Sequence, residues 1–245
     1  MSSGHFDSIA GVYDESLPPH VVEHYLEKRV RFVLEHCPPG RGLDVGCGTG
    51  ALAARLFAAG YEMTGLDPSE GMLDVLRSRA PEVRAVSGSG SSLPFPDDSF
   101  DLVLSVAVMH HVADPEQVRL TLAEMVRVAS PSGRILVWDH NPRNPYWRLL
   151  MARVPQDTGE ERLIPEGELV AGLGAAGAGI LLSRRLGMVP DFVPHGALKA
   201  AAAAERAMER TPLVRGLAAH NVVLATKEPR AVRDFQREAA ESGRA

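Results

Sequence analysis

Cysteine, aromatic residues and long apolar runs are scarce in this sequence. Only two of its 245 residues are cysteine, Cys37 and Cys47, and aromatic residues account for 5%. One disulfide is possible on count alone, but free thiols in a cytoplasmic protein are the better expectation. No apolar run approaches the roughly 20 residues of a membrane-spanning helix. The first residues have neither the basic start nor the apolar core of a secretory signal.

An excess of charge of one sign is also missing. The chain has 26 Lys and Arg residues against 31 Asp and Glu residues, which gives a net charge of -5. This balance provides no electrostatic reason to expect nucleic acid as a partner. With 45% hydrophobic and 23% charged residues, the chain can bury one sizeable core and differs from a disordered protein. We expect a single domain, monomeric or homodimeric, whose partner is a small molecule.

Helical and strand-like segments alternate from about residue 21 onward. Such alternation is typical of an α/β protein with a mostly parallel sheet. The expected strands are 42–45, 61–66, 83–86, 101–105, 134–137, 180–186 and 221–225. The expected helices are 21–36, 51–59, 69–79, 114–129, 166–176 and 200–209. Between 139 and 165 the pattern loosens, and the prolines at 142 and 145 interrupt both strand and helix.

Three glycines, Gly46, Gly48 and Gly50, stand between the first expected strand and the helix after it. Glycines at this point allow a tight turn and close approach of a nucleotide to the backbone. Asp67 ends the next strand, where an acid accepts hydrogen bonds from a ribose. Asp44 precedes the glycines, where a carboxylate repels a pyrophosphate and attracts an ammonium group. A ligand with a ribose and a free amino acid end, but no phosphate, fits both acids better than NAD does.

Several motifs then follow one another in a fixed order over residues 29–139. They are LDVGCGTG (43–50), DPS (67–69), GSGSSLPF (88–95) with DSFD (98–101), MHH (109–111) and PSGR (131–134). Together they resemble class I S-adenosylmethionine (SAM)-dependent methyltransferases, in the small-molecule branch that includes sugar, polyketide and quinone methyltransferases. The resemblance implies a Rossmann-like, seven-stranded, mostly parallel sheet with helices on both faces and an antiparallel last strand.

The resemblance also implies which residues contact SAM. By motif position these are Asp44, Gly46, Cys47, Gly48, Gly50, Asp67, Pro68, Met72, Ser89, Gly90, Ser91 and Ser105. One position departs from the family pattern, because Ser89 stands where an acid usually lies beside the adenine amino group. An adenine contact by the side chain of residue 89 is therefore in question.

His110 and His111 follow the fourth expected strand, and Asp139 follows the fifth. Histidine is the side chain whose ordinary pKa best suits proton abstraction near neutral pH, and an aspartate can orient it. In the O-methyltransferases that this segment resembles, such a histidine and aspartate serve the acceptor hydroxyl. C-methylating relatives carry the same histidine pair, so the kind of acceptor atom stays open.

The residues expected to contact the acceptor are Tyr13, His140, Tyr146 and Trp147. We expect one domain over 1–245, made of an N-terminal cover (1–28), a cofactor-binding core (29–139), acceptor-side insertions with the last strands (140–226) and a tail (227–245). The segment 138–142 is similar to actinobacterial methyltransferases found with glycan-modifying enzymes, which implies a sugar hydroxyl as the acceptor.

Three alternatives remain beside methyl transfer to a hydroxyl. One is C- or N-methylation of a quinone-like or other small metabolite, and another is a SAM-binding module without catalysis. An NAD-dependent oxidoreductase comes third, because Asp44 disfavours a pyrophosphate. The nine histidines show no spacing with cysteines or carboxylates that is typical of metal ligands, so the sequence predicts no metal site.

Overall fold

The computed structural model describes residues 3–228 and contains one seven-stranded sheet. The predicted tail lies outside the described residues from position 229 on. The strand order is β3-β2-β1-β4-β5-β7-β6. The strands are β1 Arg41–Val45, β2 Glu62–Asp67, β3 Arg84–Ser87, β4 Phe100–Val106, β5 Ala129–His140, β6 Ala178–Leu186 and β7 His220–Lys227.

The sheet is parallel except at its last strand. β1 pairs in parallel with β2 and β4, and β3 and β5 extend this parallel part on either side. β7 runs antiparallel to both of its neighbours, β5 and β6. The expected mostly parallel sheet with an antiparallel last strand is confirmed.

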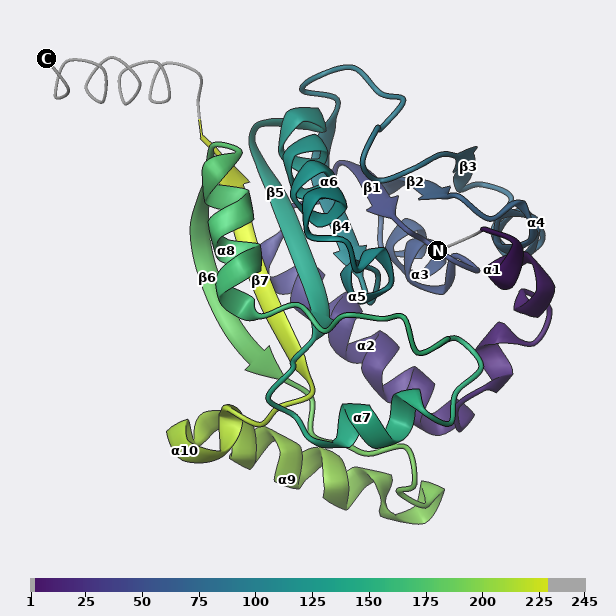
Figure 1. Cartoon of the computed structure of the whole chain (residues 1–245), viewed down its shortest axis with the longest axis vertical. Helices are drawn as coiled ribbons and strands as arrows, with labels where there is room; N and C mark the ends of the chain where they lie inside the picture. The colour runs from purple at the N-terminus through teal and green to yellow at the C-terminus, as the bar shows by residue number, and fades with distance from the viewer. Residues whose placement is uncertain (1–2, 229–245) are drawn as a thin grey trace, which may run out of the picture.

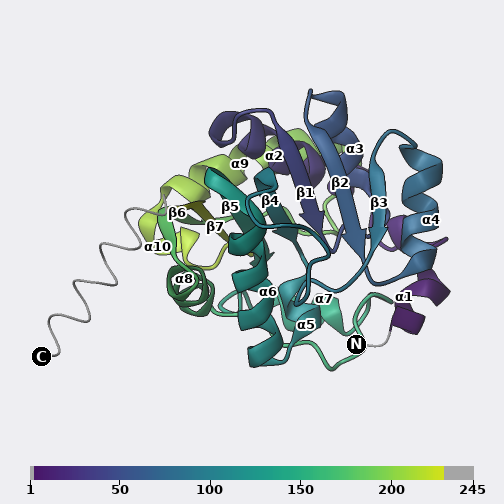
Figure 2. The same ribbon diagram turned by 90° about the horizontal axis from the view of Figure 1, so that it is seen from above.

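Helices cover both faces of the sheet (Figures 1 and 2). On one face, buried residues of α2, α3 and α4 pack against the strands, and on the other face those of α6 and α8 do so. The helices are α1 Ser3–Ile9, α2 Pro19–His36, α3 Ala51–Ala58, α4 Glu70–Arg79, α5 Met109–Val112, α6 Pro115–Val128, α7 Tyr146–Met151, α8 Glu166–Ala175, α9 Leu198–Arg210 and α10 Pro212–Arg215. Two short 3₁₀ helices, η1 Tyr13–Glu15 and η2 His195–Ala197, lie before α2 and α9.

Two helix starts follow directly from local sequence. The Ser69 hydroxyl accepts a hydrogen bond from the Met72 amide and caps α4. Asp114 caps α6 in the same way, and Pro115 occupies its first turn. The cap of α4 lies directly after β2, and the cap of α6 lies after α5, so each cap fixes where the segment that follows its strand ends.

The structure differs from the sequence prediction in several short segments. The short helices α1, α5, α7 and α10 lie in segments where no helix was expected. The strand expected at 134–137 is longer in the structure, because β5 begins at Ala129 and includes Ser132, which has a φ of 66°. The pairing register between β4 and β5 shifts at this point, so the strand absorbs the irregularity as a bulge.

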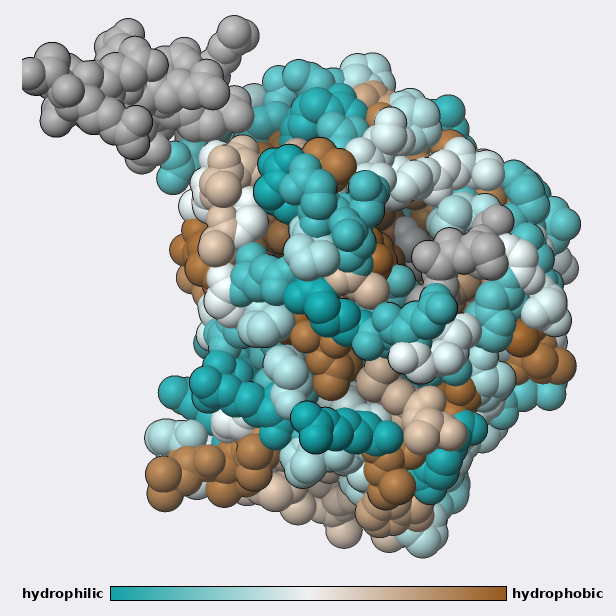
Figure 3. Space-filling view, in the orientation of Figure 1, coloured by the Kyte–Doolittle hydropathy of each residue, from teal (hydrophilic) through white to brown (hydrophobic). Residues whose placement is uncertain are grey.

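α7 and α9 lie beyond the ends of β5 and β6, on the side to which these strands point (Figure 1). Most of the surface in Figure 3 is hydrophilic, with apolar areas over α10 and along the edge strand β6. There Leu213 is 92% exposed and Leu181 is 48% exposed. Within residues 3–228, no helix is both long and apolar enough to cross a membrane.

Candidate active site

The glycine loop after β1 adopts backbone conformations that favour glycine. Gly46, Gly48 and Gly50 have φ values of 75°, 52° and 74°. A Cβ atom on Gly46 would lie 2.5 Å from the Val108 side chain, whereas a Cβ on Gly48 would meet nothing within 4 Å. The first glycine therefore allows two loops to pack closely, and the second leaves open space above the backbone.

Asp67 fastens this loop to the end of β2. Its two carboxylate oxygens accept hydrogen bonds from the amides of Gly48 and Ser69, each at 2.9 Å. Each oxygen has a second lone pair, and Asp67 lines the open space beside Gly48. The carboxylate is thus held in place and still able to accept hydrogen bonds from a ribose.

A cavity of about 330 Å³, which we call the glycine-loop cavity, opens between Gly48, Asp67 and the loops after β3 and β4. The predicted SAM contacts that line it are Gly46, Gly48, Asp67, Pro68, Met72, Ser89, Gly90 and Ser91. The other predicted contacts, Asp44, Cys47, Gly50 and Ser105, do not line it. Its walls also include residues that the sequence analysis did not single out, among them Phe6, Gln117 and Thr121.

Asp44 is buried at the carboxyl end of β1. Burial, reinforced by the charge of Asp67 and opposed by that of Arg29, raises the pKa of the Asp44 carboxyl to about 7. A buried acid next to a glycine loop, once ionised, fits an incoming ammonium group.

Arg29 on α2 is a residue that the sequence analysis missed. Its Nε atom is buried and has no hydrogen-bond partner among the described residues. Burial lowers its pKa, while the charges of Asp44 and Asp139 and the phenols of Tyr25 and Tyr13 oppose that shift. The spacing of Tyr25 and Arg29, four residues apart on the helix face that buries Val33, was the available signal.

The pair Asp44 and Arg29 fits SAM. SAM has an ammonium and a carboxylate on its methionine end, and the charges of Asp44 and Arg29 are complementary to them. Among the described residues that line the glycine-loop cavity there is no lysine or arginine to neutralise a pyrophosphate. The residues present therefore fit SAM.

A second cavity, of about 230 Å³, lies next to the first, and we call it the histidine cavity. Tyr13, Ala107 and His111 line both cavities, so the two spaces share a wall. Every predicted acceptor contact lines the histidine cavity, namely Tyr13, His140, Tyr146 and Trp147. α2, α7 and the segment before α9 enclose it, and Arg29 reaches it from α2.

Asp139, at the end of β5, holds His110 on α5. Oδ1 of Asp139 lies 2.8 Å from Nδ1 of His110, and Oδ2 accepts the amides of Val108 and Met109 at 3.1 and 2.6 Å. Burial raises the pKa of the Asp139 carboxyl, but the charge and hydrogen bond of His110, with those of His140, hold it well below its usual range. Asp139 is therefore an ionised acceptor that keeps the proton of His110 on Nδ1.

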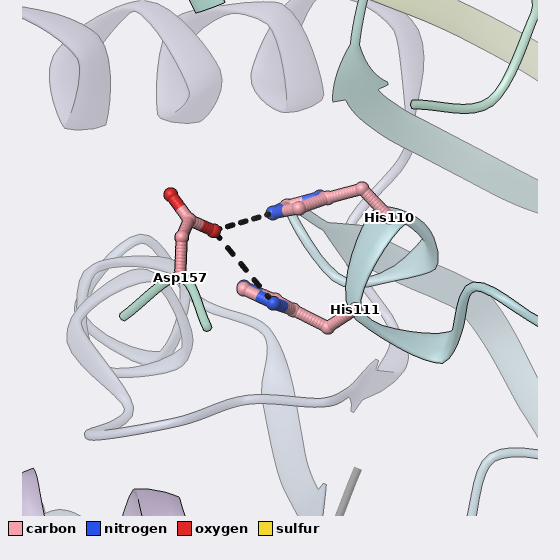
Figure 4. A group of neighbouring side chains, drawn as sticks. All are labelled: His110, His111 and Asp157. Atoms are coloured by element: carbon pink, nitrogen blue, oxygen red, sulfur yellow. Dashed lines mark ion pairs between the residues drawn. The ribbon is translucent and has the colours of Figure 1, made fainter. Parts of the chain in front are cut away.

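Asp157 is a second missed residue, from the loop between α7 and α8. Its Oδ1 lies 4.0 Å from Nε2 of His110 and 4.0 Å from Nδ1 of His111 (Figure 4). Both Nδ1 of His111 and Oδ1 of Asp157 are buried without a hydrogen-bond partner within residues 3–228. Asp157 lies in an irregular loop more than 40 residues after His110 and His111 in the sequence, so no spacing rule could have linked it to them.

The buried histidines differ from free histidine in solution. Burial, together with the neighbouring histidines, lowers the pKa of His111 to about 2 and that of His140 to about 3. Burial raises the pKa of the Asp157 carboxyl to about 6, although the charge of His110 opposes this shift. His111 and His140 are therefore neutral imidazoles at neutral pH.

Comparison with known proteins identifies the family of the chain. The family model of the methyltransferase domain matches residues 43–137. A demethylmenaquinone methyltransferase of Renibacterium salmoninarum is 31% identical over 164 residues, which cover 61% of this chain and 68% of that protein. An uncharacterised methyltransferase of Mycobacterium tuberculosis is 36% identical over 146 residues, covering 58% of this chain and 55% of that protein. This alignment spans about half the length of the mycobacterial relative.

Solved structures share the fold. A SAM-dependent methyltransferase of Thermotoga maritima, described as a possible histamine N-methyltransferase, superposes with a TM-score of 0.69 at 22% identity, covering 92% of this chain and 99% of that one. The magnesium protoporphyrin IX methyltransferase of Synechocystis, solved with bound S-adenosylhomocysteine (SAH), gives a TM-score of 0.58 at 18% identity, covering 84% and 83%. The motif order, the sheet topology and the similarity to the Renibacterium enzyme together show that the chain belongs to the class I SAM-dependent methyltransferases.

Proposed function

We propose that the chain transfers the methyl group of SAM to a hydroxyl of a small molecule bound in the histidine cavity. The observation that carries this proposal is the hydrogen bond between Asp139 and His110 in a cavity that shares a wall with the glycine-loop cavity. The Asp139 carboxylate keeps a proton on Nδ1 of His110, which leaves the Nε2 lone pair free to accept another.

The glycine-loop cavity would bind SAM by its two ends. Asp67 accepts hydrogen bonds from the ribose, and Ser89, Gly90 and Ser91 line the adenine side. The methionine end would extend towards the wall shared with the histidine cavity, where Arg29 would bind its carboxylate and the ionised Asp44 would attract its ammonium group. The sulfonium of bound SAM supplies an activated methyl group, so this chain mainly has to position the acceptor and take up its proton.

His110 is the proposed proton acceptor, and Asp139 is its positioning residue. A hydroxyl is a poor nucleophile until its proton leaves, and a positioned base typically contributes about 10²–10⁴-fold to the rate. Asp139 stabilises the imidazolium that forms. His111, neutral and common to both cavities, directs the hydroxyl towards the methyl group and is the second candidate for proton uptake.

The walls of the histidine cavity support a cyclic acceptor. Tyr13, Tyr25, Tyr146 and Trp147 line it beside aliphatic side chains such as Leu150 and Val189. Aromatic faces with polar tips suit a ring that has hydroxyls at its edge, such as a sugar or a phenol. A second cavity next to the cofactor site also argues against a SAM-binding module without catalysis, because such a module needs no acceptor space.

Carbon methylation of a quinone-like ring is the second candidate. The similarity to the Renibacterium demethylmenaquinone methyltransferase favours it. A ring carbon becomes nucleophilic when a neighbouring hydroxyl loses its proton, so His110 would have the same role in both reactions. The two candidates are distinguished by which atom of the product carries the new methyl group.

The domain organisation stays part of the proposal. We place the cofactor-binding core at 29–139, with 1–28 covering the cofactor and 140–226 covering the acceptor. Asp7 contacts the start of α4 through Ser69 at 2.6 Å and the amide of Gly71 at 3.0 Å, which supports the N-terminal cover. The free thiols of Cys37 and Cys47 support a cytoplasmic location.

A test combines binding with product analysis. Purified protein is incubated with SAM and a panel of sugars, glycosides, phenols and quinols, and mass spectrometry detects the mass of one added methyl group. We expect O-methylated product from wild type and from the control His195→Ala, whose exposed side chain lines neither cavity, and at least 10²-fold less from His110→Ala. Full turnover by His110→Ala on a hydroxyl acceptor would exclude His110 as the base.

A further inference from the structure

Three atoms that could bind a metal ion lie close together in the histidine cavity. No hydrogen bond between the described residues joins them. Nε2 of His110, Nδ1 of His111 and a carboxylate oxygen of Asp157 all lie within 4.8 Å of one another. Both histidine atoms are 4.0 Å from Oδ1 of Asp157, which is too long for a hydrogen bond. In Figure 4 the carboxylate points towards the two imidazoles from the opposite side of the gap.

Each of these atoms is available as a ligand. Within residues 3–228, Nδ1 of His111 and Oδ1 of Asp157 are buried and have no hydrogen-bond partner. The proton of His110 is held on Nδ1 by Asp139 at 2.8 Å, so its Nε2 carries a lone pair. Buried polar atoms without partners are rare in folded proteins and require an explanation.

We propose that His110, His111 and Asp157 bind a divalent transition-metal ion in the histidine cavity. Two imidazoles and one carboxylate that leave other positions open are the donor set of catalytic zinc sites and of non-haem Fe²⁺ sites. Calcium and magnesium prefer oxygen ligands throughout, so they fit this set poorly. The expected occupants are Zn²⁺, Fe²⁺, Mn²⁺ or Co²⁺.

The hydrogen bond that His110 makes with Asp139 is also typical of a metal site. A histidine that binds a metal usually donates its other ring N–H to a carboxylate, which fixes the ring and raises its basicity. Asp139 does this for His110. A second group, His110, Asp139 and His140, has a similar composition, but Asp139 and His140 both face Nδ1 of His110 at hydrogen-bond distance, so no space for an ion remains between them.

Ion binding requires only a small closure. Ligand atoms on one zinc ion lie about 2.0–2.2 Å from it and roughly 3.0–3.5 Å from one another. The 4.0 Å separations must therefore shrink by about 0.5–1 Å. Asp157 belongs to the irregular segment between α7 and α8, where no helix or strand resists such a shift. Oε1 of Glu161, 3.9 Å from Nδ1 of His111, offers a further oxygen at the same edge.

The metal site does not depend on which acceptor is methylated. It does use the Nε2 lone pair of His110, the same lone pair that accepts the proton in the proposed function. Metal binding and proton uptake at this atom exclude each other. The rate of methyl transfer is therefore measured on chelator-treated protein, in which Nε2 of His110 is free to accept a proton. Metal binding is measured separately, without any acceptor.

The test is direct metal binding by the whole chain. Protein treated with EDTA and then dialysed is titrated with Zn²⁺ by calorimetry and with Co²⁺ by visible absorption. We expect one ion per chain, and at least a 10-fold weaker affinity for Asp157→Asn and for His111→Ala. Asp191→Asn is the matched control, because Asp191 lines the same cavity but bonds Tyr146 instead of the histidines. It should bind both ions as wild type does.

Folding and function are checked separately. Asp157→Asn and Asp191→Asn, at residues that line only the histidine cavity, should still bind SAH, which shows that the sheet and the glycine-loop cavity are intact. Folding of His111→Ala, at a residue that lines both cavities, is checked by thermal unfolding. Failure of wild type to bind Zn²⁺ and Co²⁺, or binding that Asp157→Asn and His111→Ala leave unchanged, overturns the metal site. Neither result bears on the proposed function. The proposed function fails instead if the chelator-treated chain does not bind SAH or forms no methylated product.

Discussion

Nδ1 of His110 and Oδ1 of Asp139 are 2.8 Å apart, and both side chains are almost fully buried. The two residues come from different elements, α5 and β5, which meet because β4 and β5 are parallel neighbours and α5 directly follows β4. The same carboxylate accepts the amides of Val108 and Met109. Asp139 thereby positions the histidine side chain and the backbone that carries it.

Replacement of Asp139 by asparagine should lower turnover more than cofactor affinity. Asparagine has about the same shape, but its amide offers only one acceptor oxygen, so His110 is no longer held with its proton on Nδ1. We expect kcat to fall by about 10²–10⁴-fold while SAH affinity stays within a factor of about three. Steady-state kinetics of chelator-treated protein and SAH calorimetry measure the two effects. An unchanged kcat would show that Asp139 has only a structural role.

Asp67→Ala should weaken binding of SAH. The change removes the acceptor of ribose hydroxyls and also frees the Gly48 amide that the carboxylate holds at 2.9 Å. We expect a loss of about 1.5–3 kcal/mol in binding free energy, measured by calorimetry. Asp74→Ala, an exposed aspartate on α4, is the control and should bind SAH normally. Equal affinities of the two variants would contradict a ribose contact by Asp67.

SAH affinity should depend on pH through Asp44. Burial, together with the charge of Asp67, raises the pKa of Asp44 to about 7 against the opposing charge of Arg29. The carboxyl is neutral below that pH and attracts an ammonium group only once it ionises. We expect affinity to rise between about pH 5.5 and 7.5, where the α-amino group of SAH is still largely protonated.

The stability of the free protein should change in the opposite direction. The folded state holds the Asp44 proton more tightly than the unfolded chain does, so this contribution to stability is complete below about pH 4 and is lost as pH rises through about 7. Asp44→Asn should flatten both profiles, recorded by calorimetry and by thermal unfolding from pH 5 to 8. If Asp44→Asn kept the wild-type pH profiles of SAH affinity and stability, other groups would be responsible for them.

Glu205 should anchor α9 and the preceding segment to α2. It is 1% exposed, it accepts Nζ of Lys28 at 2.7 Å and Nε2 of His24 at 2.9 Å, and it also accepts the Met188 amide. Glu205→Ala leaves a partly buried lysine with one partner fewer, so we expect a loss of about 3–5 kcal/mol in unfolding free energy. Hydrogen exchange should become faster in residues 188–217 before it does in the sheet.

The pH dependence provides a second readout for Glu205. Although burial opposes ionisation, the bonds to His24, Lys28 and Met188 lower the pKa of its carboxyl to about 2. The resulting stability is complete above the unfolded pKa of about 4.3 and is lost as pH falls towards 2. Glu205→Gln should lose this acid dependence. If the hydrogen-exchange rates of residues 188–217 in Glu205→Ala matched those of wild type, contacts other than those of Glu205 would hold this segment in place.

Local sequence was sufficient for the sheet and for one side of the site. Alternating helix and strand patterns predicted the strand positions, because strands buried on both faces read as apolar runs between helices. Gly46, Gly48 and Asp67 were predicted because they occupy strand ends, and parallel strands place their carboxyl ends at one edge. Each of these inferences depends on residues close together in the chain or on a rule of sheet topology.

Only the tertiary structure decided that Asp157 meets His110 and His111 and that the charge of Arg29 acts on Asp44. Asp157 belongs to a loop without helix or strand periodicity, and Arg29 comes from a helix outside the motifs. Such contacts depend on how α2 and the segment after α7 pack over the sheet ends. Packing of this kind joins residues far apart in sequence through side-chain shape and burial, which no local pattern of the chain encodes.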